Sequence, residues 1–202
     1  MSFHETKNII AGEGDALLIN DERFIERAEI VREKGTNRSK FFRGQVDKYT
    51  WVDIGSSYLP GEIVAAFLWA QMEDVKKITQ KRLAIWNAYQ GALIGLEREG
   101  VVDLPVVPAE CRHNAHMFHL LFGNLEERSH AIEFLKQHDI TAVFHYVPLH
   151  SSPAGLRFGR ANGDMTVTDD TSDRLLRLPL YYDMTEDDTQ RVIAALGAFN
   201  KS

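Results

Sequence analysis

A long helical stretch near the middle of the chain constrains the fold more than any other part of the sequence. Its first part, residues 63–70, is apolar on every side, which predicts a helix that is buried all round or lies in a subunit interface. After Met72 the pattern becomes amphipathic, with one stripe made of Val75, Ile78, Arg82, Ile85, Trp86, Tyr89, Leu93 and Leu96. We therefore expect one long or kinked helix that ends near Gly100 and links two domains.

Beyond residue 100 the sequence alternates between short apolar runs and amphipathic segments. We expect strands or extended segments at 117–122, 141–147 and 178–182, helices at 127–138, 169–176 and 185–200, and a glycine-rich loop at 151–168. This alternation predicts a small α/β domain.

The first part of the chain is less regular. Apolar runs at 9–11 and 16–19 flank a tetrapeptide with two glycines, which predicts two strands joined by a tight turn. Asn20-Asp21 is expected to cap a helix that ends at Gly35. The polar, aromatic and aperiodic segment 36–58 predicts a long ordered loop, and loops of that length in compact proteins are usually functional.

The composition excludes several classes of function. The 202 residues carry a net charge of −6, from 23 basic and 29 acidic side chains, which argues against a nucleic-acid groove or an anionic membrane surface. No apolar run reaches the roughly 18–20 residues that span a bilayer. Because no basic-plus-apolar signal opens the sequence and Cys111 is the single cysteine, we expect a cytoplasmic protein.

Two patterns resemble binding motifs but are better explained otherwise. His113, His116 and His119 have the spacing H-x-x-H-x-x-H of a metal triad. The segment reads as extended, however, and side chains three apart on a strand point to opposite faces, so we expect no metal site. Gly12-Glu-Gly14 lacks the third glycine of a dinucleotide fingerprint and joins strands rather than opening a helix.

Motifs spread over the whole chain point to one family. They are Ser2-Phe-His-Glu-Thr-Lys7-Asn8 with Gly12-Glu-Gly14, Arg32-Glu-Lys-Gly-Thr-Asn37-Arg38, Ser57–Ala66, His145-Tyr146-Val-Pro148-Leu-His150, and Leu175–Leu180. In order and spacing they resemble the DegT/DnrJ/EryC1/StrS family of sugar aminotransferases, which use pyridoxal 5'-phosphate (PLP). The chain most resembles the branch that aminates a nucleotide-linked 4-keto-6-deoxyhexose, as in dTDP-4-amino-4,6-dideoxygalactose transaminase.

The resemblance implies an α/β fold that is the C-terminal part of a fold type I PLP-dependent aminotransferase. Residues 1–72 match a remnant of the large PLP-binding domain, 73–100 the connecting helix and 101–202 the small C-terminal α/β domain. The implied cofactor is pyridoxal 5'-phosphate, and the implied substrates are a nucleotide sugar and an amino donor, expected to be glutamate. Neither nucleic acid nor membrane is an expected partner.

The resemblance also assigns roles to single residues. Lys7 matches the Schiff-base lysine, which acts first as nucleophile and then as general base. Ser2 matches a hydroxyl that binds the cofactor phosphate, although it is also simply the second residue of the chain. Asn37 matches an asparagine that reaches the cofactor phosphate of a neighbouring subunit, which implies a homodimer. The alternative is that Asn37 only caps or turns the chain after a helix.

Three further residues, His145, Tyr146 and His150, match a region near the sugar site. Their side chains could hydrogen-bond sugar hydroxyls or the diphosphate, and the alternative for the histidines is a satisfied structural role.

In this family the segment before the lysine supplies several cofactor contacts. These are an Asp that keeps the pyridine nitrogen protonated, an aromatic residue stacked on the ring, and backbone amides at a helix start. We expect the chain to be inactive unless a complementing N-terminal half supplies them. The alternative is a non-catalytic, truncated relative that acts only as a dimerisation or interaction module.

Overall fold

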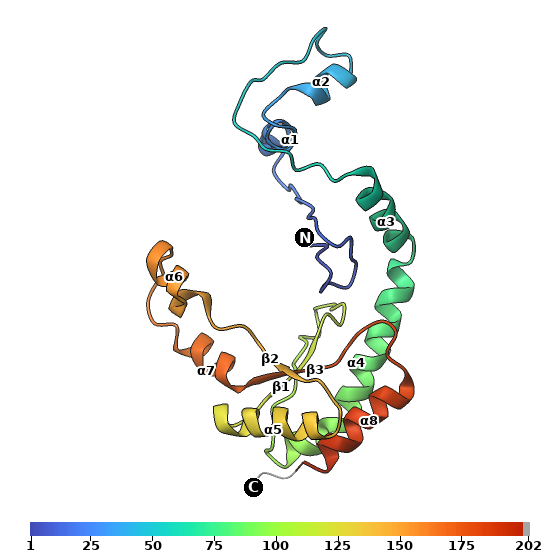
Figure 1. Ribbon diagram of the computed structural model, residues 1–202, viewed down its shortest axis with the longest axis vertical. Coiled ribbons are helices and arrows are strands. Elements are labelled where there is room, and N and C mark those ends of the chain that lie inside the picture. Colours follow the sequence, from blue (N-terminus) through green and yellow to red (C-terminus); the bar gives the residue numbers. More distant parts are fainter. Residues whose placement is uncertain (200–202) are drawn as a thin grey trace. The chain divides into compact units, whose positions relative to one another are not determined.

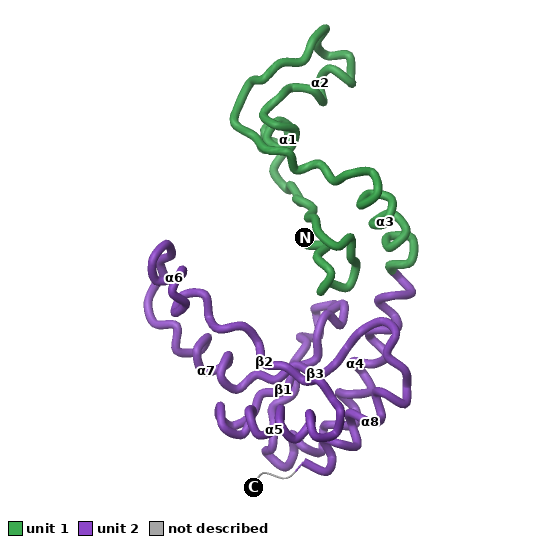
Figure 2. Tube along the Cα trace, viewed as in Figure 1, with its two compact units in different colours: residues 1–75 green, residues 76–202 purple. Residues whose placement is uncertain are grey.

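The computed structural model describes residues 1–199, which form two compact units. The first unit covers Met1–Val75 and the second begins at Lys76, as Figure 2 shows, and Figure 1 labels their helices and strands. Asn200, where the expected last helix was to end, lies outside the described residues. Within residues 1–199, no helix combines the length and the apolar character needed to cross a bilayer.

The second unit is built on a three-stranded antiparallel sheet. Its strands are β1 (Phe118–Leu121), β2 (Val143–Phe144) and β3 (Leu175–Leu178), and β3 lies in the middle although it comes last in the sequence. Arg177 of β3 pairs with His119 of β1 on one side and with Val143 of β2 on the other. Alternate residues of β1 and β3 are buried, so one face of the sheet meets the core.

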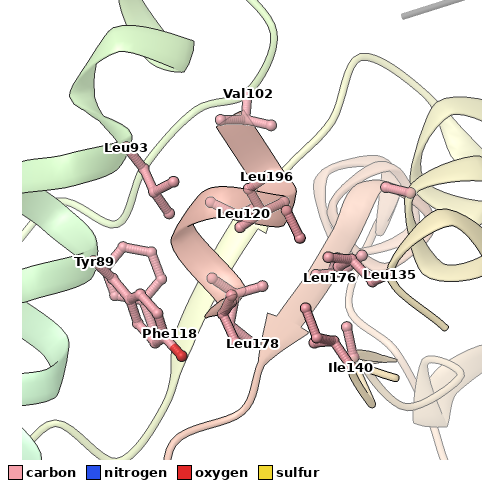
Figure 3. Close-up of a cluster of buried hydrophobic side chains, with 14 of the residues drawn as sticks. Tyr89, Leu93, Val102, Phe118, Leu120, Leu135, Ile140, Leu176, Leu178 and Leu196 are labelled. Carbon is pink, nitrogen blue, oxygen red and sulfur yellow. The ribbon is translucent and has the colours of Figure 1, made fainter. Parts of the chain in front are cut away.

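Three helices supply much of the rest of this core: α4 (Val75–Arg98), α5 (Leu125–Gln137) and α8 (Glu186–Gly197). Figure 3 shows side chains from these helices meeting those of the sheet, among them Tyr89, Leu93, Phe118, Leu120, Leu135, Leu176, Leu178 and Leu196. The Tyr89 hydroxyl donates a hydrogen bond to the carbonyl of Pro179 (2.9 Å), which satisfies its polar end inside the core.

Local signals set the helix ends in this unit. The Asn124 side chain accepts the N–H of Glu127 (2.9 Å), so α5 begins two residues earlier than the apolar pattern suggests. Thr185 and Asp188 form a reciprocal capping box at the start of α8. The helix expected from residue 185 is therefore confirmed, with Thr185 as its cap and Glu186 as its first residue.

Two expectations for this unit are wrong. The segment 151–168 is not a loop throughout, because it contains the end of η2 (Leu149–Ser151), the short α6 (Pro153–Phe158) and the start of α7 (Thr166–Arg174). Ser152 caps α6 by accepting the N–H of Gly155. The helix expected to run to 176 ends at Arg174, because Leu176 and Leu178 alternate with Arg177 and fit a strand.

The long central helix is present but broken. Helix α3 (Glu62–Glu73) has Asp74 as its C-cap, and α4 begins at the next residue, Val75. Most of the stripe of α4 is buried, including Arg82, whose guanidinium donates to the carbonyls of Ala115 (3.0 Å) and His116 (2.7 Å). Pro60 lies directly before Gly61, the N-cap residue of α3.

The first unit has little regular structure besides α3. It contains η1 (Glu22–Phe24), α1 (Ile25–Arg32) and a short α2 (Arg38–Phe42) inside the segment expected as a loop. Asp21 caps η1, as expected, and Gly35 follows α1 with φ +74°. A Cβ at Gly35 would lie 1.7 Å from the carbonyl oxygen of Asp53, so only glycine fits there.

The burial expected for residues 63–70 is not observed within this chain. No residue of α3 is buried, and Ile63 and Trp69 are 88% and 69% exposed. Burial all round is therefore wrong for the chain taken by itself. The other expectation, a subunit interface, stays a prediction.

Candidate functional site

The N-terminal segment folds back on itself and places Lys7 at its turn. Residues 1–5 bond to residues 11–16, with Phe3 N–H donating to the Gly14 carbonyl (2.8 Å) and Ala11 N–H to the Phe3 carbonyl (2.7 Å). The two strands expected at 9–11 and 16–19 are therefore wrong: only isolated bridges form, and their partners precede Lys7. Positive φ angles at Gly12 and Gly14 interrupt the extended backbone.

The backbone of Lys7 is tied into this turn, and its amine is left available. Its N–H donates to the carbonyl of His4 (2.9 Å), and Phe3 and Ile9 are buried on either side of it in the sequence. The side chain is exposed. Among residues 1–199, no carboxylate lies within ion-pair distance of the Lys7 amine.

Ser2 belongs to the same fold-back. Its Oγ accepts the N–H of His4 (3.3 Å), and it forms a bridge with Asp15. Because the Ser2 hydroxyl accepts in this contact, its own hydrogen remains available for an anion such as a phosphate. His4 is in turn hydrogen-bonded through Nδ1 to the Thr6 hydroxyl (3.1 Å), which stiffens the turn before Lys7.

Asn37 closes a loop rather than capping a helix. It stands at the N-cap position of α2 but makes no side-chain capping bond there. Instead its Oδ1 accepts the N–H of Thr50 (2.7 Å), and its own N–H donates to the Thr50 carbonyl (3.1 Å). These two bonds hold residues 37 and 50 of the polar segment together, and within the described residues no hydrogen bond joins Asn37 to Ser2 or Lys7.

The second unit carries the other candidates. His145 and Tyr146 follow β2, and their rings lie 5.3 Å apart. Tyr146 is 70% exposed, while its carbonyl accepts from the Ser172 hydroxyl (3.0 Å). His150 has a structural partner, because its Nε2 lies 3.1 Å from Oδ1 of Asp169 in α7. The structure thus places His145 next to Tyr146, whereas His150 is paired with Asp169 of α7.

Sequence reasoning missed one residue beside His145. Arg177 lies over the ring of Tyr146, with its Cζ 5.8 Å from the ring centroid. Burial, and then the Arg177 charge, lower the pKa of His145. The alternation of leucine and arginine in 175–178 is the signal that could have placed Arg177 on the face opposite the core.

A second histidine lies on the same face of the sheet. This residue, His119, pairs with Arg177 across the strands. Burial, and then the charge of His145, lower the pKa of His119. Among residues 1–199, no group of three or more His, Cys, Asp or Glu side chains could hold a metal ion.

The lowered histidine pKa values predict a pH dependence of stability. The unfolded chain takes up protons near the ordinary pKa of 6.5, where folded His119 and His145 are still neutral. The free energy of unfolding of the second unit is therefore expected to be full above about pH 6.5 and to fall as pH drops below it. Urea unfolding of wild type and of the H119Q/H145Q double variant would test this. The double variant should show a shallower fall, and an unchanged slope would contradict the assignment.

The fold is that of PLP-dependent aminotransferases, in their C-terminal part. The model of the DegT/DnrJ/EryC1/StrS aminotransferase family matches residues 1–197, and the chain belongs to this family. The family, and with it the fold expected from the motifs, is confirmed. Aminotransferases of this family depend on pyridoxal 5'-phosphate.

Three relatives show the extent of the likeness. An uncharacterized protein, MJ1066 of Methanocaldococcus jannaschii, is 29% identical over 96% of this chain and 52% of its own length. The UDP-4-amino-4-deoxy-L-arabinose–oxoglutarate aminotransferase of Shewanella sediminis is 27% identical over 96% of this chain and 53% of its own. The crystal structure of a DegT/DnrJ/EryC1/StrS aminotransferase from Brucella abortus superposes on this chain with a TM-score of 0.81 at 25% identity. The match includes all of this chain and 50% of the Brucella chain. The chain thus spans about half the length of these relatives.

The residues present fit the cofactor of the family. PLP is held covalently by an amine and electrostatically through its phosphate, and the fold-back offers both an amine and a hydroxyl donor. Among residues 1–199, no ion pair engages the Lys7 amine, so it is open to the cofactor aldehyde.

Proposed function

We propose that this chain is the C-terminal part of a PLP-dependent aminotransferase that converts a nucleotide-linked 4-keto-6-deoxyhexose to the 4-amino sugar. The proposed relationship is to dTDP-4-amino-4,6-dideoxygalactose transaminase, with glutamate as the amino donor. The observation that carries the proposal is the position of Lys7: its backbone is tied into the turn of a fold-back that also contains the Ser2 hydroxyl, and its amine has no carboxylate partner among the described residues. The Shewanella relative, named for a 4-amino sugar and oxoglutarate, supports the same class of reaction.

Each candidate residue has a separate part in this proposal. The Nζ of Lys7 bonds the cofactor and afterwards moves a proton to and from the substrate carbon. The Ser2 hydroxyl donates to the cofactor phosphate, and Asn37, through its free amide hydrogens, reaches the phosphate in a neighbouring subunit. His145 and Tyr146 contact the nucleotide sugar, with His150 beside them in sequence. Bound PLP supplies an electron sink for the negative charge that develops on the substrate carbon.

We propose further that the active enzyme contains an N-terminal part about as long as this chain. The relatives are about twice as long as the region that matches. Residues outside the matched half are expected to hold the ring nitrogen and stack on the ring. The proposed assembly is a dimer, because Asn37 is assigned to a neighbouring subunit.

Reductive labelling tests the proposal. The chain is incubated with PLP alone and with the complementary N-terminal part, reduced with borohydride, and the labelled lysines are mapped by mass spectrometry. We expect weak or scattered labelling of the chain alone and one specific label on Lys7 when both parts are present. A label spread over many lysines in the complete assembly would refute the role of Lys7.

A matched pair of variants sharpens this experiment. Lys7→Arg keeps the charge but removes the nucleophilic amine, and it should abolish the specific label. Lys48→Arg makes the same change at another exposed lysine of the first unit and should leave the label in place. Loss of the label in both variants would show a general effect on the fold and not a site.

A second candidate function is favoured by one observation. Helix α3 is apolar and unburied in this chain, with Phe67 half exposed and Ile63 almost fully exposed. Such a surface is typical of an interface. A chain that acts only as a dimerisation or interaction module would associate through this helix and show no specific Lys7 label in any assembly.

A further inference from the structure

The outer face of the three-stranded sheet gathers three nitrogen-bearing side chains. His119 and Arg177 are direct partners across β1 and β3, and both stand at positions that alternate with buried leucines. Val143 is level with Arg177 on β2, so His145, two residues further along, points to the same face. His145 is therefore the diagonal neighbour of Arg177 across the strands, and a long arginine side chain can reach a neighbour in that position.

Two of these side chains have buried nitrogen atoms that the described residues leave unused. The Nε of Arg177 and the Nδ1 of His145 are both buried and have no hydrogen-bond partner among residues 1–199. The only hydrogen bond from the Arg177 guanidinium is a long one, from Nη2 to the Phe144 carbonyl (3.4 Å), among the bonds of the described residues. Buried polar groups are nearly always satisfied, so an unused pair on one face calls for a ligand or ordered water.

No acid neutralises this cluster within the described part of the chain. None of the ten ion pairs involves His119, His145 or Arg177. The overall charge of the protein is −6, so the positive character of this face is local. The Tyr146 ring forms a wall beside the guanidinium at 5.8 Å.

We propose that His119, His145 and Arg177 form a binding site for a phosphate-type oxyanion on the outer face of the sheet. The planar fork of an arginine matches two oxygens of a phosphate, and each imidazole can donate one further N–H. The ligand class is a free or nucleotide-linked diphosphate. The site lies within the second unit and shares His145 with the sugar contacts proposed above, so its nucleotide-linked ligand rests on the proposed function. Binding of diphosphate here does not involve Lys7, so this inference and the role of Lys7 can fail separately.

The test follows histidine side-chain nitrogens by NMR in the full chain labelled with ¹⁵N. His119→Gln and His145→Gln variants assign the two imidazoles, and pyrophosphate, dTDP and glutamate are added in separate titrations at constant ionic strength. We expect saturable shifts of both imidazoles with pyrophosphate or dTDP. Binding of pyrophosphate alone indicates a free diphosphate, and tighter binding of dTDP indicates a nucleotide-linked one. Equal binding of glutamate would overturn the phosphate assignment.

Variants of the arginine decide whether the site is specific. Arg177→Gln should weaken pyrophosphate binding by about tenfold or more, since it removes a charge-assisted pair of hydrogen bonds. Arg177→Lys keeps the charge and the fold and should bind with intermediate affinity. Arg98→Gln removes the same charge from an exposed position on α4 and should change nothing. Equal weakening in Arg177→Gln and Arg98→Gln, or shifts that never saturate, would refute the proposal, whereas Lys7 labelling should be unaffected by every one of these variants.

Discussion

Replacing Lys7 with arginine is expected to reduce the turnover of the complete enzyme by at least about 10²–10⁴-fold. That range is the typical contribution of a general acid–base group alone, and loss of the covalent bond to the cofactor adds to it. Arginine stays protonated at any working pH, so it can neither attack the cofactor nor accept a proton. The measurement is a single-turnover rate for conversion of the 4-keto sugar, with the chain in its full assembly.

The control for this variant separates chemistry from folding. Lys48→Arg, also in the first unit, should retain full turnover, and the unfolding midpoints of both variants should match wild type. If Lys7→Arg kept a turnover within a few-fold of wild type, the assignment of Lys7 would be wrong. If added primary amines restored part of the lost rate, the missing group would be identified as an amine.

Replacing Phe118 with alanine is expected to destabilise the second unit by about 3–5 kcal/mol. Phe118 lies in β1, is fully buried, and its ring packs 5.3 Å from both Trp86 and Tyr89 of α4. The substitution leaves a cavity between the sheet and α4, and it removes two aromatic contacts. Equilibrium unfolding in urea, followed by tryptophan fluorescence, measures the change.

Val106→Ala is the matched control for the core variant. Val106 is an apolar residue of the same unit that is 86% exposed, so its truncation should change the free energy of unfolding by less than about 0.5 kcal/mol. A loss of stability in Phe118→Ala no larger than in this control would contradict the packing described for α4 and the sheet.

The parts of the fold with strong periodicity were predictable. The stripe of α4, the cap at Thr185 and the strand at Phe118–Leu121 all follow from spacing and capping chemistry, and each is present. The predicted position of β3 was wrong because its leucines also suit the end of a helix. Only their pairing with β1 shows that they form a strand. The hairpin expected around Gly12 failed because its strands bond to residues 1–5 instead of to each other.

The candidate site was predictable only in part, because its signals are of two kinds. Lys7 and Ser2 lie in one short motif, and the fold-back keeps them in the same small structure. Arg177 is separated from His145 by 32 positions along the chain and joins it only through the order of strands in the sheet. Spacing along a sequence carries no information on such pairs until the sheet order is known.

The position of the last strand in the middle of the sheet has a consequence for synthesis on the ribosome. β1 and β2 both pair with β3 and not with each other, so the sheet cannot close until residues 175–178 emerge, long after β1 and β2 have been made. During that interval α4 can cover Phe118, but the edges of β1 and β2 that bind β3 stay unpaired, and nascent chains stalled before Leu175 should be held by chaperones or degraded.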